Sequence, residues 1–396
     1  MTSETETLTG NISTLYLLSL QDLSDGPLIV EVPPGRILGH IDNVYQQVIT
    51  DIGKKGPYEG EGGIFLILPP GFDGEIPDGY FVAQSDSMQI IVVARSFVGD
   101  TGKEAAVEQN KKINVYKLSE ADNPPKVKMI DAIGTPLKLA HPTTEGFWEF
   151  LHEVYSKEPI VRPEDRNLIG LMHSIGIVPG ESFEPDEHSK KLLDEAAEVG
   201  NLMMKSVAFN SPIKESWIYY PDKNWEVAFM TENPSFEDEL GATQIDPRQS
   251  YVHQAITTSD AMVLKQIGTG SKYLMNYRDS NDDWLIGSNT YHIQIPANVP
   301  AENFWALTAY DAETRSTIVN DVQPLPGIRS LDADTLLQND DGSYDAYFGP
   351  EAPEGFESNW VKTNEGDGFF VIFRFYAQTE AYFDKSWQLP MIEKIE

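Results

Sequence analysis

The stretch that decides the fold lies near the C-terminus and reads NFWALTAYD (303–311), TRSTIVND (314–321), NDDGSYDAYFGP (339–350), NWVKTNEGDGFFVIFRFY (359–376) and FDKSW (383–387). Aromatic residues, single arginines and turns of the DG or PEG kind alternate along it. In the first segment both alternating sets of side chains are largely apolar, which predicts a central strand buried on both faces. The stretch therefore predicts β-structure with a polar rim.

The same period of two in hydrophobicity holds across the second half of the chain. Short strands are expected at 217–220, 225–230, 262–266, 273–277, 291–295, 304–310, 316–320, 344–348 and 368–376. Clusters of Asn, Asp, Gly and Pro separate them, a pattern typical of sandwiches and jelly rolls. We therefore expect residues 210–396 to form a C-terminal domain with a jelly-roll-like β-sandwich fold.

The first part of the chain also predicts strands, at 28–32, 64–68, 80–82, 89–94 and 113–117. Two of them end in Pro-Pro-Gly, which stops a strand. The glycine-rich stretch DIGKKGPYEGEGG between these two matches neither nucleotide-binding spacing, GxGxxG or GxxxxGK[ST], and predicts a mobile loop. We expect residues 1–142 to form an N-terminal β-rich domain.

The period changes between residues 143 and 209, where three amphipathic helices are predicted. Apolar residues recur at three- and four-residue steps from Phe147, and Pro163 favours the start of the second helix. His152 and His173 lie off the apolar stripes and lack metal-ligand spacing, so they are expected to face solvent. The predicted fold class is thus mainly β, with two β-rich modules and a helical connecting segment.

Composition excludes several classes of function. The 62 acidic residues outnumber the 29 basic ones, for a formal charge of -33, so neither nucleic acid nor a membrane surface is an expected partner. No cysteine is present, which excludes disulfides, thiolate metal sites and cysteine nucleophiles. The polar N-terminus has no signal-peptide pattern and no apolar run reaches the ~20 residues of a membrane span, so a soluble chain of unknown location is expected.

Three arginines are candidates for ligand binding. Arg374 interrupts the apolar run GFFVIFRFY, where an unpaired guanidinium is costly to bury, so it must reach a carboxylate, the sheet rim or a ligand. Arg278 and Arg315 lie at strand ends, where loops gather. Together the three would make a clamp for an anion or a carboxylate, with structural pairing as the alternative.

The acidic loops predict turns more simply than metal sites. QNDDGSYD, which contains Asp341, resembles part of a calcium loop but lacks the EF-hand spacing, and its DDG sequence predicts a hairpin turn. No GxSxG, HExxH, Walker or kinase pattern occurs. Dispersed Ser-His-Asp or paired carboxylate sets stay open, because their spacing is spatial. No cofactor is indicated.

These motifs resemble a known family. NISTLY (11–16), the run from DIG to GGIFLILPPGFDG and the C-terminal stretch quoted above are similar to a bacterial two-domain family, in which the N-terminal half is called domain of unknown function 1254 and the C-terminal half domain of unknown function 1214. The resemblance covers nearly the whole chain. It implies two β-rich modules with helices between them, and no agreed reaction, cofactor or catalytic set.

Two functions are favoured from the sequence, and a metal-dependent enzyme is a weaker third because histidine is sparse and scattered. The first is binding or processing of a small polar, anionic or carbohydrate-like ligand in a cleft of the C-terminal sandwich or between the modules. Its candidate residues are Trp305, Tyr310 and Trp360 for stacking, Arg278, Arg315 and Arg374 for binding, and Asp311 or Asp341 as catalytic acid or base. The second is a non-catalytic binding or assembly protein, in which an aromatic-rich surface forms a homo-oligomer interface.

Overall fold

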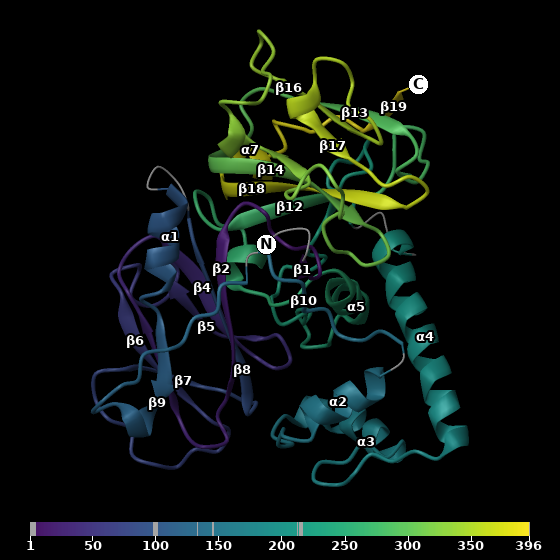
Figure 1. Cartoon of the computed structure of the whole chain (residues 1–396). Helices are drawn as coiled ribbons and strands as arrows, with labels where there is room; N and C mark the ends of the chain where they lie inside the picture. Colours follow the sequence, from purple (N-terminus) through teal and green to yellow (C-terminus); the bar gives the residue numbers. More distant parts are fainter. Residues whose placement is uncertain are drawn as a thin grey trace.

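The computed structural model describes residues 5–97, 102–132, 134–144, 146–211, 213 and 217–395. Strands make up 29% of the chain and helices 21%. The fold is therefore mixed α/β, whereas the sequence predicts a mainly β fold. Figure 1 shows an N-terminal β-rich part in purple and blue, a helical part in teal and a C-terminal β-rich part in green and yellow. None of the helices described is long and apolar enough to cross a bilayer.

The N-terminal part is a sandwich of two four-stranded sheets. One sheet has the order β2-β8-β4-β5 and the other β7-β6-β3-β9. Their bounds are β2 Leu15–Asp22, β3 Leu28–Val32, β4 Ile37–Asn43, β5 Val48–Gly53, β6 Gly63–Leu68, β7 Phe81–Gln84, β8 Gln89–Ser96 and β9 Asn114–Lys117. Ile, Leu and Val side chains from both sheets pack into one core around Phe65. Strands β3, β6 and β8 confirm the predicted strands, whereas β4, β5 and helix α1 (Gly102–Asn110) were not expected.

The helical part contains α2 (Phe147–Tyr155), α3 (Arg166–Ser174) and the long α4 (Glu187–Asn210), as predicted. Asp186 caps α4 by accepting a hydrogen bond from the Ser189 amide at 2.7 Å. The two histidines expected in solvent are half-buried instead. His152 stacks on Phe183 with the ring centroids 5.7 Å apart, and His173 lies beside Tyr155.

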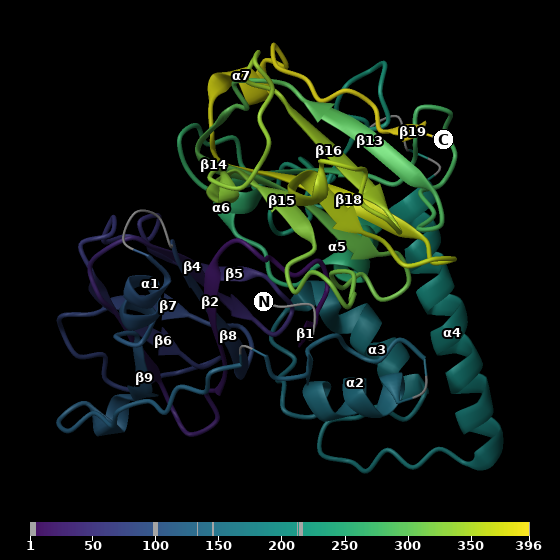
Figure 2. The same cartoon turned by 45° about the horizontal axis from the view of Figure 1, so that its top comes forward.

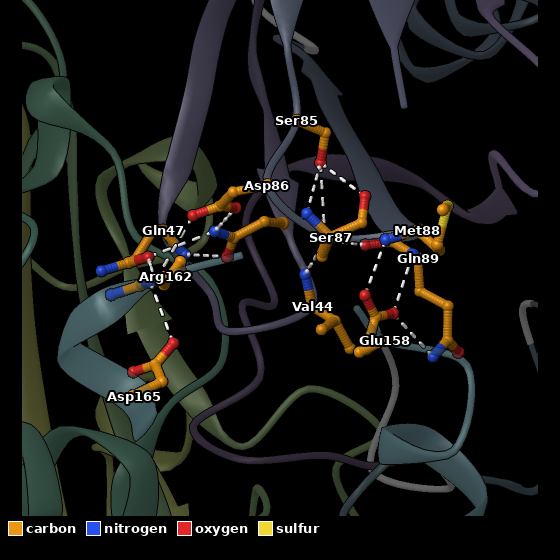
Figure 3. A network of polar contacts seen from close by, with 11 residues as sticks. Val44, Gln47, Ser85, Asp86, Ser87, Met88, Gln89, Glu158, Arg162 and Asp165 are labelled. Carbon is orange, nitrogen blue, oxygen red and sulfur yellow. Dashed lines mark hydrogen bonds and ion pairs between the residues drawn. The ribbon is translucent and has the colours of Figure 1, made fainter. Parts of the chain in front are cut away.

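A polar network fastens this helical part to the N-terminal sandwich (Figure 3). The buried Glu158 carboxylate accepts hydrogen bonds from the backbone amides of Met88 and Gln89, at 2.6 and 3.0 Å. Arg162 contacts Gln47 and forms ion pairs with Asp86 and Asp165. The connecting segment is therefore held by specific contacts and not by an apolar interface alone.

The C-terminal part has a five-stranded sheet, β11-β12-β18-β14-β15, and a four-stranded sheet, β17-β16-β13-β19. Their bounds are β11 Glu226–Val227, β12 Ser271–Asn276, β13 Thr290–Ile295, β14 Ala301–Asp311, β15 Gly327–Arg329, β16 Tyr344–Gly349, β17 Trp360–Lys362, β18 Phe369–Gln378 and β19 Glu393–Ile395. Both sheets bury side chains in one core that includes Trp305, Leu307 and Phe373. Strand β14 lies between β15 and β18 and is buried on both faces, as its sequence predicts.

Several C-terminal expectations were wrong. Neither sheet of the described residues closes, and no jelly roll is identified. The strand expected at 262–266 is replaced by the short helix α6 (Asp260–Val263), and α5 (Ile245–Gln254) precedes it. The segments 217–220 and 316–320 form only isolated bridges. β-Branched and aromatic residues favour strands only where a neighbouring strand is available for pairing.

The two sandwiches meet through their sheet faces. The face of the β2-β8-β4-β5 sheet lies below β12 in Figure 1, and the start of the chain runs between the two parts. In this start, Thr9 donates its amide to the Arg315 carbonyl at 2.7 Å, and Tyr310 Oη donates to the Gly10 carbonyl at 2.8 Å. Figure 2 shows α5 beside the same junction. The N-terminal segment is thus bound to the C-terminal sandwich and forms part of the junction.

Candidate functional site

A cavity of about 140 Å³ lies at this junction. Its walls come from β2, β4, β5 and β8 of the N-terminal sandwich, from β12 and β18 of the C-terminal sandwich, and from segments 7–11 and 251–262. An apolar cavity of about 150 Å³ holds a molecule of the size of benzene. The space therefore suits a small organic molecule with one ring or a short chain.

The N-terminal wall is built from two rows of side chains across the sheet. Strand pairing places Tyr16, Arg95 and Leu38 in one row, and Leu18, Val93, His40 and Asp51 in the next. All seven residues line the cavity. Directly paired residues on neighbouring strands point to the same face, with Cβ atoms about 5 Å apart. The N-terminal wall of the cavity is therefore formed by the sheet face and not by a loop.

The C-terminal wall is centred on Arg374 of β18, which is 4% exposed and lies between Tyr273 of β12 and Ala306 of β14. The guanidinium donates to Tyr310 Oη and, at 2.8 Å, to the Thr9 carbonyl. It also lies 5.7 Å from the ring centroid of Tyr273. The buried Nε–H has no hydrogen-bond partner within the described chain. One donor of Arg374 is therefore still available.

Arg95 of β8 faces this wall from the N-terminal sandwich and is 8% exposed. Its guanidinium donates to Ser271 Oγ of β12 at 3.1 Å, across the domain junction. The ring centroid of Tyr376 lies 5.9 Å from it. Asn11 Nδ2 donates to the Tyr376 hydroxyl at 2.6 Å, which fixes that ring between the two sandwiches. The first residue of the NISTLY motif is therefore a structural link beside the cavity.

Within the described residues, neither Arg95 nor Arg374 has an acidic partner. Arginine ion pairs in the described chain are formed by Arg162, Arg278 and Arg329, and neither Arg95 nor Arg374 is in an ion pair there. A guanidinium keeps its charge in any protein, and its burial is costly unless it is paired. Two unpaired positive charges at one cavity make it a favourable place for an anion.

Three further ionisable groups lie in or directly behind the N-terminal wall, and their pKa values are shifted. Burial, and secondly the nearby Arg95, lower the pKa of His40 to about 3, so the imidazole is neutral. Burial, and secondly the Asp260 carboxylate, raise the pKa of Asp51 to about 7. Burial also raises the pKa of Asp42, behind His40, well above its usual range. Asp51 is therefore the lining group whose charge changes near neutral pH.

The segment after α5 closes the side of the cavity. Thr257 donates its amide to Gln46 Oε1 at 2.7 Å, and Thr258 donates to Asp42 Oδ2 at 3.2 Å. Both acceptors belong to the N-terminal sandwich, at β4 and the turn that follows it. Tyr251, in the last turn of α5, also lines the cavity. The closing segment is thus connected to the N-terminal sandwich by hydrogen bonds.

Of the site residues predicted from sequence, Arg374 lines the cavity, and Tyr310 accepts a hydrogen bond from the Arg374 guanidinium. Arg315 lies near these two residues, because its carbonyl accepts a hydrogen bond from the Thr9 amide. Its guanidinium, however, donates to His253 Nδ1 at 3.2 Å. Arg278 lies elsewhere, 3.7 Å from the Trp284 ring centroid and paired with Asp282. The expected three-arginine clamp is therefore not assembled, and Arg374 is joined by Arg95 instead.

The other predicted residues have structural surroundings. Trp305 and Trp360 are buried, 5% and 9% exposed, so the expected aromatic surface is in the core. Asp311 accepts hydrogen bonds from the Glu313 and Thr314 amides, and Asp341 from the amide and hydroxyl of Ser343. Both carboxylates stabilise turns, and neither lines the cavity.

Arg95, His40 and Asp51 line the cavity but are not among the site residues predicted from the sequence. Arg95 ends the apolar run IIVVAR, which has the same form as the run before Arg374, so the cost of burying a charge could have identified it. Asp51 belongs to the glycine-rich stretch expected to be a mobile loop, which instead begins within β5. No group of three His, Asp or Glu side chains in the described residues could hold a metal ion.

Comparison with family models follows the two sandwiches. Residues 1–117 match the model described as protein of unknown function DUF1254, and residues 270–380 match the one described as protein of unknown function DUF1214. This chain is a DUF1254–DUF1214 protein. Arg95 belongs to the DUF1254 match and Arg374 to the DUF1214 match, so the cavity of this DUF1254–DUF1214 protein is completed only where the two matched regions meet.

One solved structure has a similar fold. A protein of Vibrio parahaemolyticus with a crystal structure is 20% identical, with 98% of this chain and 90% of that chain covered and a TM-score of 0.58. An uncharacterised protein of Burkholderia cenocepacia is 10% identical over 98% of this chain and 78% of its own, with a TM-score of 0.44. The first shows a similar fold, whereas the second is too distant to support an argument. No curated protein matches the chain.

Proposed function

We propose that this DUF1254–DUF1214 protein binds a small organic anion, with the ligand's carboxylate between Arg95 and Arg374. The observation that carries the proposal is the pair of buried guanidiniums, one from each sandwich, without an acidic partner in the described residues. Arginine presents a planar fork of donors that matches a carboxylate, and the unpartnered Nε–H of Arg374 is one such donor.

The lining favours an apolar body for this anion. Tyr16, Phe229, Tyr251 and Tyr273 surround the space with aromatic rings, and Leu18, Val93 and Ile372 add aliphatic surface. Ligand sites typically combine such apolar walls with a few polar groups that fix orientation. Among the polar, anionic and carbohydrate-like ligands considered from sequence, this supports an anion attached to a ring or a short chain. A sugar would leave several hydroxyl groups against apolar walls.

Binding of benzoate tests the proposal, with benzamide as a neutral probe of the same shape. We expect isothermal titration calorimetry to show binding of benzoate and at least a tenfold weaker affinity for benzamide, since charge-assisted hydrogen bonds contribute about 1.5–3 kcal/mol each. Cyclohexanecarboxylate should also bind, because the apolar body needs only to fit. Equal affinities for benzoate and benzamide would contradict the anion site.

A second candidate function is assembly through α4. Leu192, Val199, Leu202 and Met203 follow each other at helical spacing along this helix, and each is at least half exposed. The helix has 24 residues and so extends about 36 Å. An exposed apolar stripe of this kind is typical of a protein interface. We infer a second copy of the chain as the partner to test, with the two helices packed against each other.

Sedimentation velocity distinguishes this candidate. Leu202→Glu should convert a dimer to a monomer, whereas Glu198→Gln, one residue before the stripe residue Val199, should leave the dimer intact. A wild-type chain that sediments as a monomer at high concentration would exclude assembly through α4. The outcome does not bear on the ligand site, because these α4 residues do not line the cavity.

A further inference from the structure

A second cavity, of about 240 Å³, lies beside the first. Residues 35–38, the loop residues 54 and 59–61, Phe97, residues 268–270 and Asn303 line it. Arg36, Lys54, Glu59 and Glu61 are exposed, so this outer cavity has charged groups of both signs at the molecular surface. Among the described residues, Leu38 is the one that lines both cavities.

The position of Leu38 in the sheet explains why it separates the two spaces. It is the cross-strand partner of Arg95 on one side and of Gly53 on the other. Gly53 has a φ of +71°, and a Cβ there would lie 2.3 Å from the Ile37 carbonyl oxygen, so the position requires glycine. Because Gly53 has no side chain, the row that begins with Tyr16 and Arg95 ends at Leu38.

The sheet face also directs Leu38 toward the cavity. Its neighbours Ile37 and Ile41 point into the core of the N-terminal sandwich, and Leu38 does not belong to that core. Leu38 is nevertheless only 6% exposed. Its side chain is therefore buried by the cavity's own surroundings, next to the guanidinium that the proposed function assigns to the ligand's carboxylate.

We propose that Leu38 is the residue that determines ligand length. This inference rests on the proposed function of the cavity. With its carboxylate on Arg95 and Arg374, a ligand extends past Leu38 only if that side chain is smaller. A chain with a smaller residue at position 38 accepts a longer anion, whose far end enters the outer cavity near Arg36 and Lys54.

Two carboxylates of different length test this inference, benzoate and biphenyl-4-carboxylate. Calorimetry on the wild-type chain should show tighter binding of benzoate. In Leu38→Ala the ratio of the two affinities should shift toward the longer anion by roughly tenfold to a hundredfold, the effect of burying an additional ring. Leu38→Val should shift it in the same direction by less, and Leu38→Met, which conserves volume, should leave it unchanged.

Leu18→Ala is the matched control, because Leu18 lines the inner cavity and not the outer one. It should not favour the longer anion. Circular dichroism checks that each variant is folded, and Leu38→Val keeps the test informative if the larger truncation unfolds the chain. If benzoate binds and the ratio is the same in wild type, Leu38→Val and Leu38→Ala, the role of Leu38 is wrong while the proposed function stands. If benzoate does not bind to wild type, the proposed function itself fails.

Discussion

Arg374 and Arg95 approach the same cavity from opposite sandwiches, but they are held differently. Arg374 lies inside β18, whose ten residues are all buried, and donates to Tyr310 Oη and the Thr9 carbonyl. Arg95 is the next-to-last residue of β8 and donates across the junction to Ser271 Oγ. The first arginine is fixed by the fold of its own domain and the N-terminal segment. The position of the second depends on the two domains being together.

The ionisable groups divide in the same way. His40 and Asp51, whose pKa values are shifted, belong to the N-terminal wall, and Asp42, whose pKa is also raised, lies behind His40. The C-terminal wall contributes Tyr273, whose pKa is raised by burial, so it remains a neutral hydrogen-bonding group. We infer that the DUF1214 side holds the anion in a fixed geometry, while the DUF1254 side makes its binding dependent on pH.

The largest effect is expected for Arg374→Ala. It leaves the buried Tyr310 hydroxyl and Thr9 carbonyl without their partner and creates a cavity under β12 and β14. Urea unfolding should show a free energy of unfolding lower by about 3 kcal/mol, together with loss of benzoate binding. Arg374→Lys keeps the charge without the fork of donors, so it should recover only part of the free energy of unfolding and part of the benzoate affinity. An unchanged unfolding midpoint in Arg374→Ala would contradict the fixed role of this residue.

Arg95→Ala should separate binding from stability. The lost hydrogen bond to Ser271 Oγ contributes about 1 kcal/mol to folding, so the chain should remain folded. Benzoate affinity should nevertheless fall by at least about tenfold, because one of the two charges is removed. Ser271→Ala is the control, since it removes the same hydrogen bond and leaves the charge. If Arg95→Ala destabilises the chain as much as Arg374→Ala does, the two arginines are not held differently.

The same pair shows how far the sequence could predict the site. Arg374 was a candidate because it interrupts a long apolar strand. Arg95 ends a similar strand, but the predicted strand stopped at residue 94, one position before it. A charge at the end of a strand normally reaches solvent, and only the second sandwich prevents this for Arg95. Its burial is therefore a property of the domain junction, which local patterning does not contain.

The fold was predicted best where one domain alone decides it. Strands β14, β16 and β18 have apolar patterns that their own sandwich explains, and the helices of the connecting segment follow from their amphipathic spacing. Strand β4 reads ILGHIDN and was not expected, because its polar residues alternate on the face that the cavity and the segment after α5 cover. The sequence accordingly predicts a cleft between the modules as one of two places for the site, but its candidate acids, Asp311 and Asp341, lie in C-terminal turns away from the junction.

The pH dependence of binding sharpens the difference between the walls. Asp51 is neutral below its pKa of about 7 and anionic above it. Benzoate affinity should therefore fall as pH rises from 6 to 8, by roughly fivefold for a repulsion of about 1 kcal/mol. In Asp51→Asn the affinity should fall less over this range, because the lining carboxylate is removed and His40, with a pKa of about 3, stays neutral. Calorimetry at several pH values measures both, and a wild-type affinity that rises with pH would contradict this account.

Folding stability also depends on the protonation of Asp51. Because its pKa is raised on folding, the native state binds a proton more tightly than the unfolded chain does. The contribution of this group to stability is therefore present at low pH and is lost as pH rises from the ordinary aspartate range through about 7. Thermal unfolding of Asp51→Asn should lack this part of the pH dependence. A wild-type and variant pair with parallel stability profiles from pH 4 to 8 would exclude a raised pKa.

The smallest effect is expected for Asp341→Ala, and it tests whether the junction is the site at all. Hydrogen bonds from the Ser343 hydroxyl and amide lower the pKa of Asp341, so its carboxylate stabilises a turn, and this stabilisation is lost as pH falls below the ordinary aspartate range. The residue does not line the cavity, and benzoate affinity at pH 7 should stay within about twofold of wild type because surface substitutions away from a site have small effects. Asp341→Asn keeps an acceptor for Ser343 and controls for the turn. If both variants lost benzoate binding while Arg95→Ala retained it, the ligand would lie at the C-terminal loops, and the buried arginines would be structural charges of the domain junction.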